Sequence, residues 1–429
     1  MFGFANFLLL ALFAAAVFDL IFALARGGGL RGALHGLWNT PHLLLGQQLA
    51  EWRLQLGRIL FAAGLAAYEI SVVFCNSMAR QNWAWVQGVM SPVLEWLAFL
   101  CFGAKILFGT RYTWRELLAG GALYFIARWV YFNSQNIWWI GIVVAVLAAK
   151  DVPLRRPLQV YFVSGCAAIA VVLALHFAGI VAPDLTSERM GALRGTYGYG
   201  HPNTFGGLVF GLVLAYALLR AQKVRWVDCL LVFAIGVFLL VGPASRSAAL
   251  CTLALAVGLV FCRLRAGHSV PRWWPGTCAG MVGLTAAVSY LLPLLVIKVG
   301  PWNNDIGPAW LAKLDSLLTC RISLTWMAYR LLDVKIAGQV FNWPTVDNSF
   351  AFALFQFGPV AAAPLGILFA AALWGHAKQG RRVEVCCLFA MLAYAYMEVQ
   401  PFHLTTNPTA LLLCGAVFAQ TSARWQKIE

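Results

Sequence analysis

Charge is scarce in this sequence. Only 11% of its 429 residues are Asp, Glu, Lys or Arg, whereas a soluble protein carries roughly a quarter of such residues. Hydrophobic residues make up 61% of the chain. This balance excludes an ordinary soluble domain and indicates an integral membrane protein. Segments of about ten residues with alternating hydrophobicity, the signature of a transmembrane barrel, are absent, so the spans are expected to be helices.

Several motifs of known chemistry are missing as well. The 11 cysteines are scattered, mostly within apolar stretches, and form no CxxC motif, so we interpret them as small hydrophobic residues. The sequence has no DxD, no HExxH and no carboxylate pair at metal-ligand spacing. The net charge of +15 comes from Lys and Arg dispersed between apolar runs, which argues against a nucleic-acid partner. We therefore expect no metal and no other cofactor.

Apolar runs bounded by charges and turn residues predict thirteen spans. At roughly 20 residues a span, the chain has room for about a dozen helices, so we predict an all-α polytopic membrane protein with about 12–13 transmembrane helices. The first run has no basic residue before it, which is untypical of a signal peptide, and we expect it to be retained. The predicted spans begin near Phe2, Ile59, Ala84, Leu117, Ile137, Leu158, Thr204, Trp226, Ser247, Trp274, Ser349, Val385 and Pro408.

The distribution of the basic residues predicts the orientation of the spans. If the N-terminus lies outside, most of the 31 Lys and Arg fall in inner loops, and every inner loop is basic. Two long loops, residues 182–201 and 300–346, then face outward, and long loops between membrane helices usually carry function. We divide the chain into an N-terminal helix with a basic cytoplasmic segment, residues 1–58, and a multi-span domain, residues 59–429.

The first long loop runs into a span through the segment SERMGALRGTYGYGHPNTFGG, residues 187–207. Pro202 suits the first turn of a helix, which makes His201 the expected cap. A helix N-terminus favours anions, and Arg189 and Arg194 just before it can grip a phosphate with two N–H groups each. Other side chains expected to bind substrate here are Tyr197 and Tyr199, as flat faces for sugar rings, and Asn203. The alternative is an ordinary surface loop with interfacial tyrosines.

Two further arginines fall on the predicted outer side. Arg246 stands between two serines at the start of a span, where it either extends to the lipid headgroups or meets a polar partner. An amphipathic helix is predicted over residues 308–332, and Arg321 lies in the middle of its apolar face. A guanidinium in that position must meet an anion, which is either a protein carboxylate or a ligand.

The second long loop ends at TVDNSFAFALFQFGPVA. Asp347 stands where a span is predicted to begin, and Asn348 is suited to capping it. A carboxylate at the membrane boundary is a candidate general base; the alternative is that Asp347 only caps the helix. Arginines, one His, one Asp and two Asn are thus predicted to meet on one side of the membrane, where a lipid diphosphate could bind without a metal.

Several of these segments, taken in order, resemble one family. RGTYGYGHPNTFG, SRSAAL, LDSLLTCRISL, AGQ at residues 337–339, VDNSF and FGPVA resemble the bacterial polysaccharide polymerases of the O-antigen polymerase and ligase superfamily. KDVPL after the fifth predicted span is also typical. The match runs from about residue 105 to residue 360 and leaves out the first 58 residues. Each segment is short, and it is their order and outward placement that make the set specific.

The resemblance implies a metal-independent glycosyltransferase of GT-C-like helical architecture in the bacterial cytoplasmic (inner) membrane. Such enzymes act on polyprenyl-diphosphate-linked oligosaccharides, usually invert the anomeric centre, and build capsule or other cell-envelope polysaccharide, with a flippase and a chain-length regulator as possible partners. By motif, Arg194, Arg246 and Arg321 would hold diphosphates, and the acceptor site would be lined by His201, Asn203, Asp347 and Asn348. The Asp-Asn pair favours the polymerase branch, because the ligase branch carries His-Asn there; the base is either Asp347 or His201.

Two other functions stay open at this stage. A ligase-type enzyme would transfer the glycan to a lipid core or a protein. A transporter or flippase of lipid-linked glycans would place ionisable residues near the membrane midplane, often in repeated halves. Glu69, Glu95 and Arg128 are the main charges within predicted spans, but a structural Glu–Arg pair explains them equally well, and no matching halves are evident.

Overall fold

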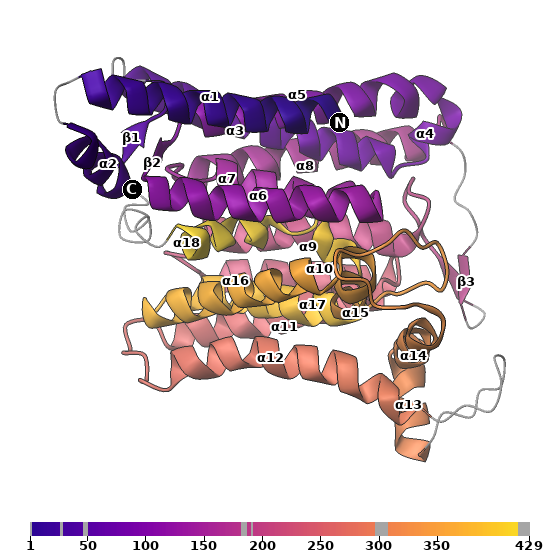
Figure 1. Cartoon of the computed structure of the whole chain (residues 1–429). Coiled ribbons are helices and arrows are strands. Elements are labelled where there is room, and N and C mark those ends of the chain that lie inside the picture. Colours follow the sequence, from indigo (N-terminus) through magenta and orange to yellow (C-terminus); the bar gives the residue numbers. More distant parts are fainter. Residues whose placement is uncertain are drawn as a thin grey trace. The chain divides into compact units, whose positions relative to one another are not determined.

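The computed structural model describes residues 2–25, 29–45, 50–181, 187–189, 192–296 and 308–418, and these residues are mostly helical (Figure 1). Contacts divide the chain into two units, each of which is described by itself. Unit 1 comprises Met1–Arg128, Ile140–Pro183 and Ala410–Glu429. Unit 2 comprises Trp129–Trp139 and Asp184–Thr409.

Unit 1 is a set of apolar helices in which α3 packs against both α5 and α8. Close packing of α3 depends on glycine, because a Cβ at Gly57 would lie 2.7 Å from the Cα of Gly109. A short ladder joins β1 (His42–Leu43) to β2 (Arg111–Tyr112). The helices are α1 (Phe2–Ala25), α2 (Gly29–Asn39), α3 (Ala50–Cys75), α4 (Ala79–Asn82), the π-turn η1 (Val86–Met90) with α5 (Ser91–Phe108), most of α6 (Trp114–Ser134) and α7 (Ile137–Ala148), α8 (Arg155–Phe177), and, at the C-terminal end, most of η5 (Pro408–Leu413) and α18 (Cys414–Val417).

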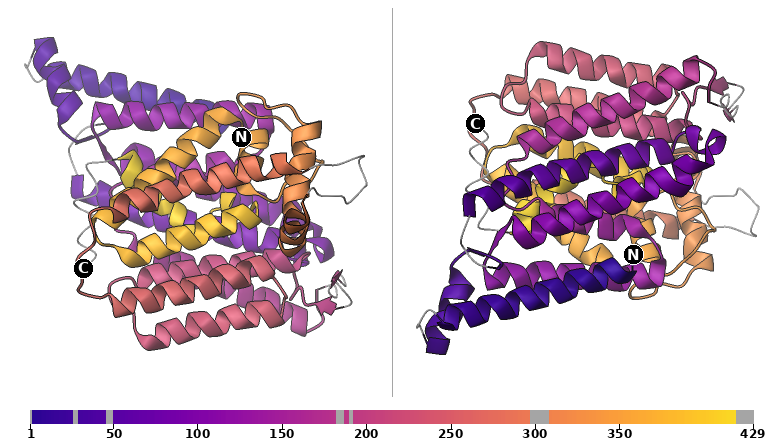
Figure 2. Two further views of the ribbon diagram at one scale, coloured as in Figure 1. Left: turned by 90° about the horizontal axis from the view of Figure 1, so that it is seen from below. Right: turned by 90° about the horizontal axis from the view of Figure 1, so that it is seen from above.

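Unit 2 holds the remaining helices and one hairpin, β3 (Ser187–Arg189) with β4 (Ala192–Arg194). Helix α11 packs against α10 and α17, and α12 packs against α16; Figure 2 shows these long helices from below and from above. The elements are α9 (Pro202–Leu219), α10 (Trp226–Val241), α11 (Arg246–Leu264), α12 (Trp274–Leu291) with η2 (Leu292–Leu295), α13 (Ala309–Leu317), α14 (Arg321–Leu331), α15 (Ser349–Phe352) with η3 (Ala353–Phe357), α16 (Pro359–Lys378), α17 (Arg382–Met397) and η4 (Gln400–Phe402).

The apolar helices confirm that the chain is an all-α, multi-pass membrane protein. Within the described ranges, seven helices are long and apolar enough to cross a membrane. Shorter apolar helices occur at Phe13–Ala25, Ile137–Ala148, Trp226–Val241 and Pro408–Val417, each near a predicted span; the total of 12–13 stays a prediction. The seven long ones are Glu51–Cys75, Val86–Phe108, Arg155–Phe177, Pro202–Leu219, Arg246–Leu264, Trp274–Leu295 and Pro359–Lys378.

The prediction of a single amphipathic helix over residues 308–332 is wrong. The structure has two helices there, α13 and α14, because Thr319 and Cys320 both take left-handed backbone conformations, with φ of 58° and 64°. The side chain of Asp315 stabilises the break, since its Oδ1 accepts from the backbone N–H groups of Ile322 and Ser323, at 2.8 and 3.2 Å. Arg321 is therefore the first residue of a new helix rather than a residue within an apolar face.

Two predicted boundaries also differ from the structure. The span predicted to start at Ser349 breaks at Gly358, whose φ is +76°, and the long apolar helix begins only at Pro359. The domain boundary predicted at residue 58 falls inside α3, because Arg53 and Arg58 belong to its first turns rather than to a loop. Arg53 donates from its Nε to the carbonyl of Phe108 at 2.9 Å, so this basic segment is part of the packing of unit 1.

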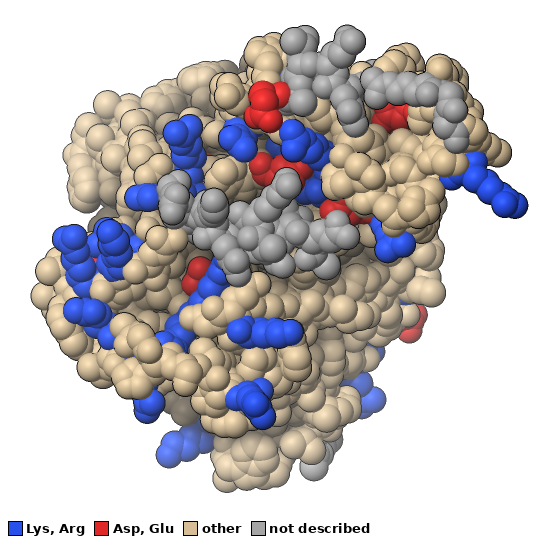
Figure 3. Space-filling view, turned by 90° about the vertical axis from the view of Figure 1, so that its left-hand side faces the viewer, with Lys and Arg blue, Asp and Glu red and all other residues tan. Residues whose placement is uncertain are grey.

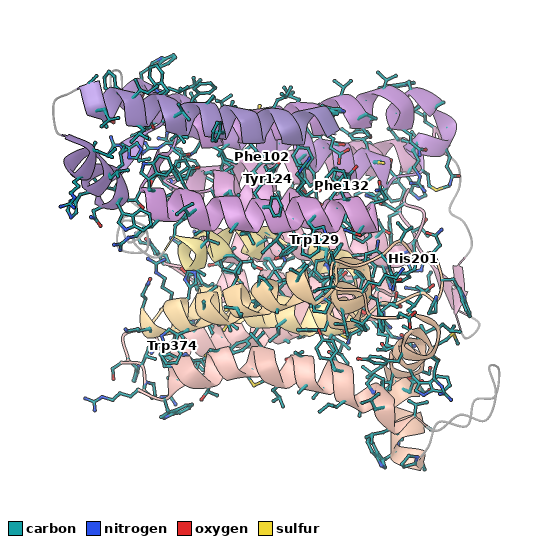
Figure 4. All side chains as sticks on the ribbon, viewed as in Figure 1. Phe102, Tyr124, Trp129, Phe132, His201 and Trp374 are labelled. Carbon is teal, nitrogen blue, oxygen red and sulfur yellow. The ribbon has the colours of Figure 1, made fainter. Side chains whose placement is uncertain are left out.

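Two labelled residues mark the two ends of unit 2. His201, at the N-terminus of α9, and Trp374, near the C-terminus of α16, lie at opposite ends of the unit (Figure 4). At the end marked by Trp374, Arg382 donates to the carbonyls of Arg265 and His268, which joins two loops predicted to be cytoplasmic. Lys and Arg side chains are scattered over the face drawn in Figure 3, with fewer Asp and Glu side chains among them.

Thiol labelling tests this orientation. Cys320 is an exposed native cysteine on the loop predicted to face outward, so we expect an impermeant maleimide to label it on intact spheroplasts. In a Cys320→Ser background, Thr345→Cys should also react, since residue 345 is exposed on the same loop. Gln379→Cys, exposed at the opposite end of α16, should react only after permeabilisation. Labelling of Gln379→Cys alone from outside would reverse the orientation.

Candidate functional site

A buried carboxylate, that of Glu398, collects donors from three other segments of unit 2. Its Oε1 accepts from the Nη2 of Arg321 at 2.6 Å, the hydroxyl of Ser247 at 2.8 Å and the Nδ2 of Asn203 at 3.0 Å. These donors come from the first turns of α14, α11 and α9. Glu398 directly follows α17 and is 5% exposed. We call Arg194, Asn203, Ser247, Arg321 and Glu398 the Glu398 cluster.

Arg321 uses its whole guanidinium within this cluster. Besides the ion pair with Glu398, its Nε donates to the carbonyl of Met397, and its Nη1 donates to the carbonyl of Leu318 at 2.9 Å and to the hydroxyl of Thr319. The side chain is buried. The prediction that Arg321 meets an anion is confirmed, and of the two alternatives the structure contains the protein carboxylate.

Arg194 and Asn203 extend the cluster toward the first long loop. Arg194 is buried, and its Nη2 donates to the Oδ1 of Asn203 at 3.0 Å and to the carbonyl of Ala244 at 3.2 Å. The Asn203 amide therefore joins Arg194 to Glu398. His201 caps α9 as predicted, because its Nδ1 accepts from the backbone N–H of Asn203 at 3.1 Å. The His201 side chain is exposed.

Arg246 is the first residue of α11, as predicted, and its side chain is exposed. The serines on either side of it are buried and belong to the same network. Ser245 Oγ donates to Asn203 Oδ1 at 3.4 Å, and Ser247 Oγ donates to Glu398. Ser245 and Ser247 thus contribute two buried hydroxyls to the cluster, and the exposed Arg246 lies between them in the sequence.

Asp347 and Asn348 directly precede α15, whose first residue contacts Glu398. Asn348 caps α15 as predicted, with its Oδ1 accepting from the N–H groups of Phe350 and Ala351 at 2.9 and 3.1 Å, and its Nδ2 donates to Ser289. The next residue, Ser349, donates its hydroxyl to the Glu398 backbone carbonyl at 2.5 Å. Asp347 is half-buried and close enough to Glu398 for charge repulsion to raise the pKa of the Glu398 carboxyl. Because Asn348 provides the cap, the side chain of Asp347 is not needed for capping.

Of the two tyrosines predicted to present flat faces to sugar rings, Tyr199 is not open to a ligand, and Tyr197 is half-buried. Tyr199 is fully buried, with its ring centroid 5.6 Å from that of Phe205. Tyr197 stacks on the same Phe205 at 5.0 Å. Both rings pack against the helices because the alternating glycines fold the loop back onto unit 2. Arg189 lies in β3, and its side chain falls outside the described residues.

Opposing charges define the electrostatics of the cluster. Burial raises the pKa of the Glu398 carboxyl above its ordinary value, and the Arg321 guanidinium counteracts that increase. The cluster holds two buried guanidinium groups, those of Arg194 and Arg321, and one buried carboxylate, that of Glu398. Two carboxylates border it: Asp347 raises the pKa of Glu398, and Asp315 accepts from the first turn of α14. Within the described part of the chain, no three His, Cys, Asp or Glu side chains gather as a metal site.

Glu398 is the residue that sequence reasoning missed. It is a single acid at the end of an apolar run, and nothing in its local sequence distinguishes it. A signal existed, however, because Arg321 required an anion and Glu398 is one of the few acids predicted at the outer ends of spans. Glu398 is therefore one of several acids that the sequence offers as partners for Arg321.

Comparison with known proteins adds no identification: no protein-family model, no curated protein and no solved structure matches this chain significantly.

Proposed function

We propose that this protein is a glycosyltransferase that polymerises polyprenyl-diphosphate-linked oligosaccharide repeats at the outer face of the bacterial cytoplasmic membrane. We further propose a GT-C-like architecture with about 12–13 transmembrane helices, metal-independent chemistry, and a flippase and a chain-length regulator as partners. The membrane would supply the donor as a lipid, so that the diphosphate lies at the depth of the helix ends.

One observation carries the proposal. The segments that resemble the polymerases are separated by up to about 150 residues, and four of them supply groups to, or beside, one cluster: Arg194 and Asn203 from the first, Ser247 from the second, Arg321 from the third and Ser349 from VDNSF. A chance resemblance would have no reason to bring its parts together in space. The cluster also holds two buried guanidinium groups, those of Arg194 and Arg321, which can stabilise the charge of a diphosphate leaving group.

The chemistry follows from these groups. The acceptor hydroxyl attacks the anomeric carbon of the donor, and the bond from that carbon to the phosphate oxygen breaks. The diphosphate leaves with the bonding electrons, and cationic side chains stabilise its charge. The hydroxyl proton passes to a base, either Asp347 or His201. Asp347 is the better placed of the two, because it lies beside Glu398 while His201 is engaged in capping α9.

A deletion strain tests the proposed function in the cell. Loss of a polymerase should leave single repeats, free on the lipid or transferred singly, and no long chains on mass spectrometry of the glycans. Loss of a ligase should instead leave long chains on the polyprenyl lipid without transfer. Loss of a flippase should trap single lipid-linked repeats on the cytoplasmic side, out of reach of an external glycosidase. Either of the last two patterns would reject the polymerase.

A further inference from the structure

The position that Glu398 occupies is suited to an external anion. A single oxygen, Oε1, receives a guanidinium N–H, a hydroxyl and an amide N–H within 3.0 Å, all from helix N-terminal turns. Phosphate oxygens are bound by the same kinds of donor. Glu398 therefore acts as an internal anion that holds these donors together in the structure.

An incoming anion and the charged carboxylate compete for the same donors. The Nη2 of Arg321 already donates to Glu398 at 2.6 Å. The Nε and Nη1 of Arg321 donate to backbone carbonyl and hydroxyl oxygens. Two negative groups in one buried place repel each other strongly, so that one of them tends to take up a proton. A phosphate with neighbouring arginines stays ionised. The carboxylate is the group that can be neutralised.

We propose that Glu398 is a positioning residue that takes up one proton when an anionic diphosphate enters the cluster, and so couples binding of that anion to pH. The inference rests on the proposed function for the identity of the anion. As a neutral acid, Glu398 releases Arg321 and has an O–H group that can donate to a phosphate oxygen. As a carboxylate, Glu398 keeps its ion pair with Arg321, and these donors are not available to another anion.

The surroundings of Glu398 favour this exchange. Burial and the nearby Asp347 both raise the pKa of the Glu398 carboxyl, whereas Arg321 and the hydroxyl of Ser247 lower it. Among the described residues, Tyr394 of α17 and Cys251 of α11 are also close enough to feel the charge of Glu398. Arg194 is linked to Glu398 through the side chain of Asn203. Losing the ion pair with Arg321 to a competing anion removes the charge that most favours the ionised carboxyl, so that burial and Asp347 are opposed only by the neutral donors Ser247 and Asn203.

The test measures binding of farnesyl diphosphate, a short prenyl diphosphate, to the purified protein in detergent. For wild type we expect the affinity to fall by up to about tenfold per pH unit as the pH rises above the pKa of the Glu398 carboxyl in the free protein, because one proton is taken up for each anion bound. Glu398→Gln, which cannot be charged, should bind with a much flatter dependence on pH. Glu384→Gln, a carboxylate at the other end of α17, should keep the wild-type slope.

Calorimetry in buffers of different ionisation enthalpy counts the protons directly and does not depend on any variant. Uptake of close to one proton supports the proposal, since binding of a phosphate to arginines alone would release protons from the ligand. No proton uptake, equal slopes in wild type and Glu398→Gln, or no binding at any pH would each overturn it. Proton-linked binding without any glycosyl transfer would reject the proposed function and leave the proton-linked anion site standing.

Discussion

Replacing Arg321 by alanine should nearly abolish polymer formation and also destabilise the protein. The substitution leaves Glu398 buried without its cation, which typically costs about 3–5 kcal/mol of unfolding free energy. Removing one preorganised donor from a site that stabilises developing negative charge lowers turnover by about 10²–10³-fold. Turnover of a lipid-linked repeat and the melting temperature in the same detergent measure the two effects separately.

A double variant separates a catalytic role of Arg321 from a structural one. In Arg321→Ala with Glu398→Gln, both charges of this ion pair are removed together, so much of the lost stability should return. Turnover should stay low, because the leaving group still lacks its guanidinium. If turnover returned together with stability, Arg321 would be only a structural residue.

Two single variants complete the series. Arg321→Lys should also remain impaired, since an ammonium cannot reproduce the donation from Nε, Nη1 and Nη2. Arg330→Ala is the matched control, because this exposed arginine lies in the last turn of α14 over the Trp326 ring. It should leave turnover close to wild type.

Asp347→Asn should lower turnover by about 10²–10⁴-fold, the usual contribution of a positioned general base to the rate. The variant isolates chemistry from structure, because Asn348 caps α15 and Asp347 does not. Binding of the lipid-linked substrate and the melting temperature should change little. His201→Gln should lose much less, since its imidazole serves as the cap of α9. Normal turnover in Asp347→Asn with a dead His201→Gln would transfer the role of base to His201.

Much of the fold follows from the sequence by simple physics. Apolar length predicts helices, and the positive-inside bias predicts which ends of the unit 2 helices lie together; the contact of Glu398 with Asn203 and Ser247 at one end and that of Arg382 with Arg265 at the other agree with it. The caps at His201 and Asn348 were predictable because Pro202 and the polar Asn348 mark the starts of helices.

Other features depend on tertiary contacts that no local pattern encodes. The helical wheel over residues 308–332 assumed a continuous helix, and the two left-handed residues at 319 and 320 displaced every later residue from its predicted face. Asp315 stabilises that break with its carboxylate, but nothing in the sequence distinguishes it from an ordinary residue within a helix. Tyr199 was expected to be open to a ligand because its glycine-rich surroundings resemble a loop, yet packing against Phe205 buries it.

The sequence predicts several residues of the site but not the hydrogen bonds that join them. The sequence points to Arg194 and Asn203 from their place at the start of a span and to Arg321 from its place in the apolar face of a predicted loop helix, and the structure joins all three through Glu398. A sequence can show that a buried arginine needs an anion. It cannot show which of several acids, 77 residues away in the case of Glu398, supplies it.

Mass spectrometry of a purified reaction tests the central claim most directly. The protein, in detergent with a chelator and a single lipid-linked repeat, should convert that repeat into a ladder of longer lipid-linked chains, and one polyprenyl diphosphate should be released for each bond formed. Arg321→Ala should produce neither the ladder nor the released lipid. If the wild-type protein leaves the repeat unchanged but moves it across the bilayer of proteoliposomes, it is a transporter and the proposed glycosyl transfer is wrong.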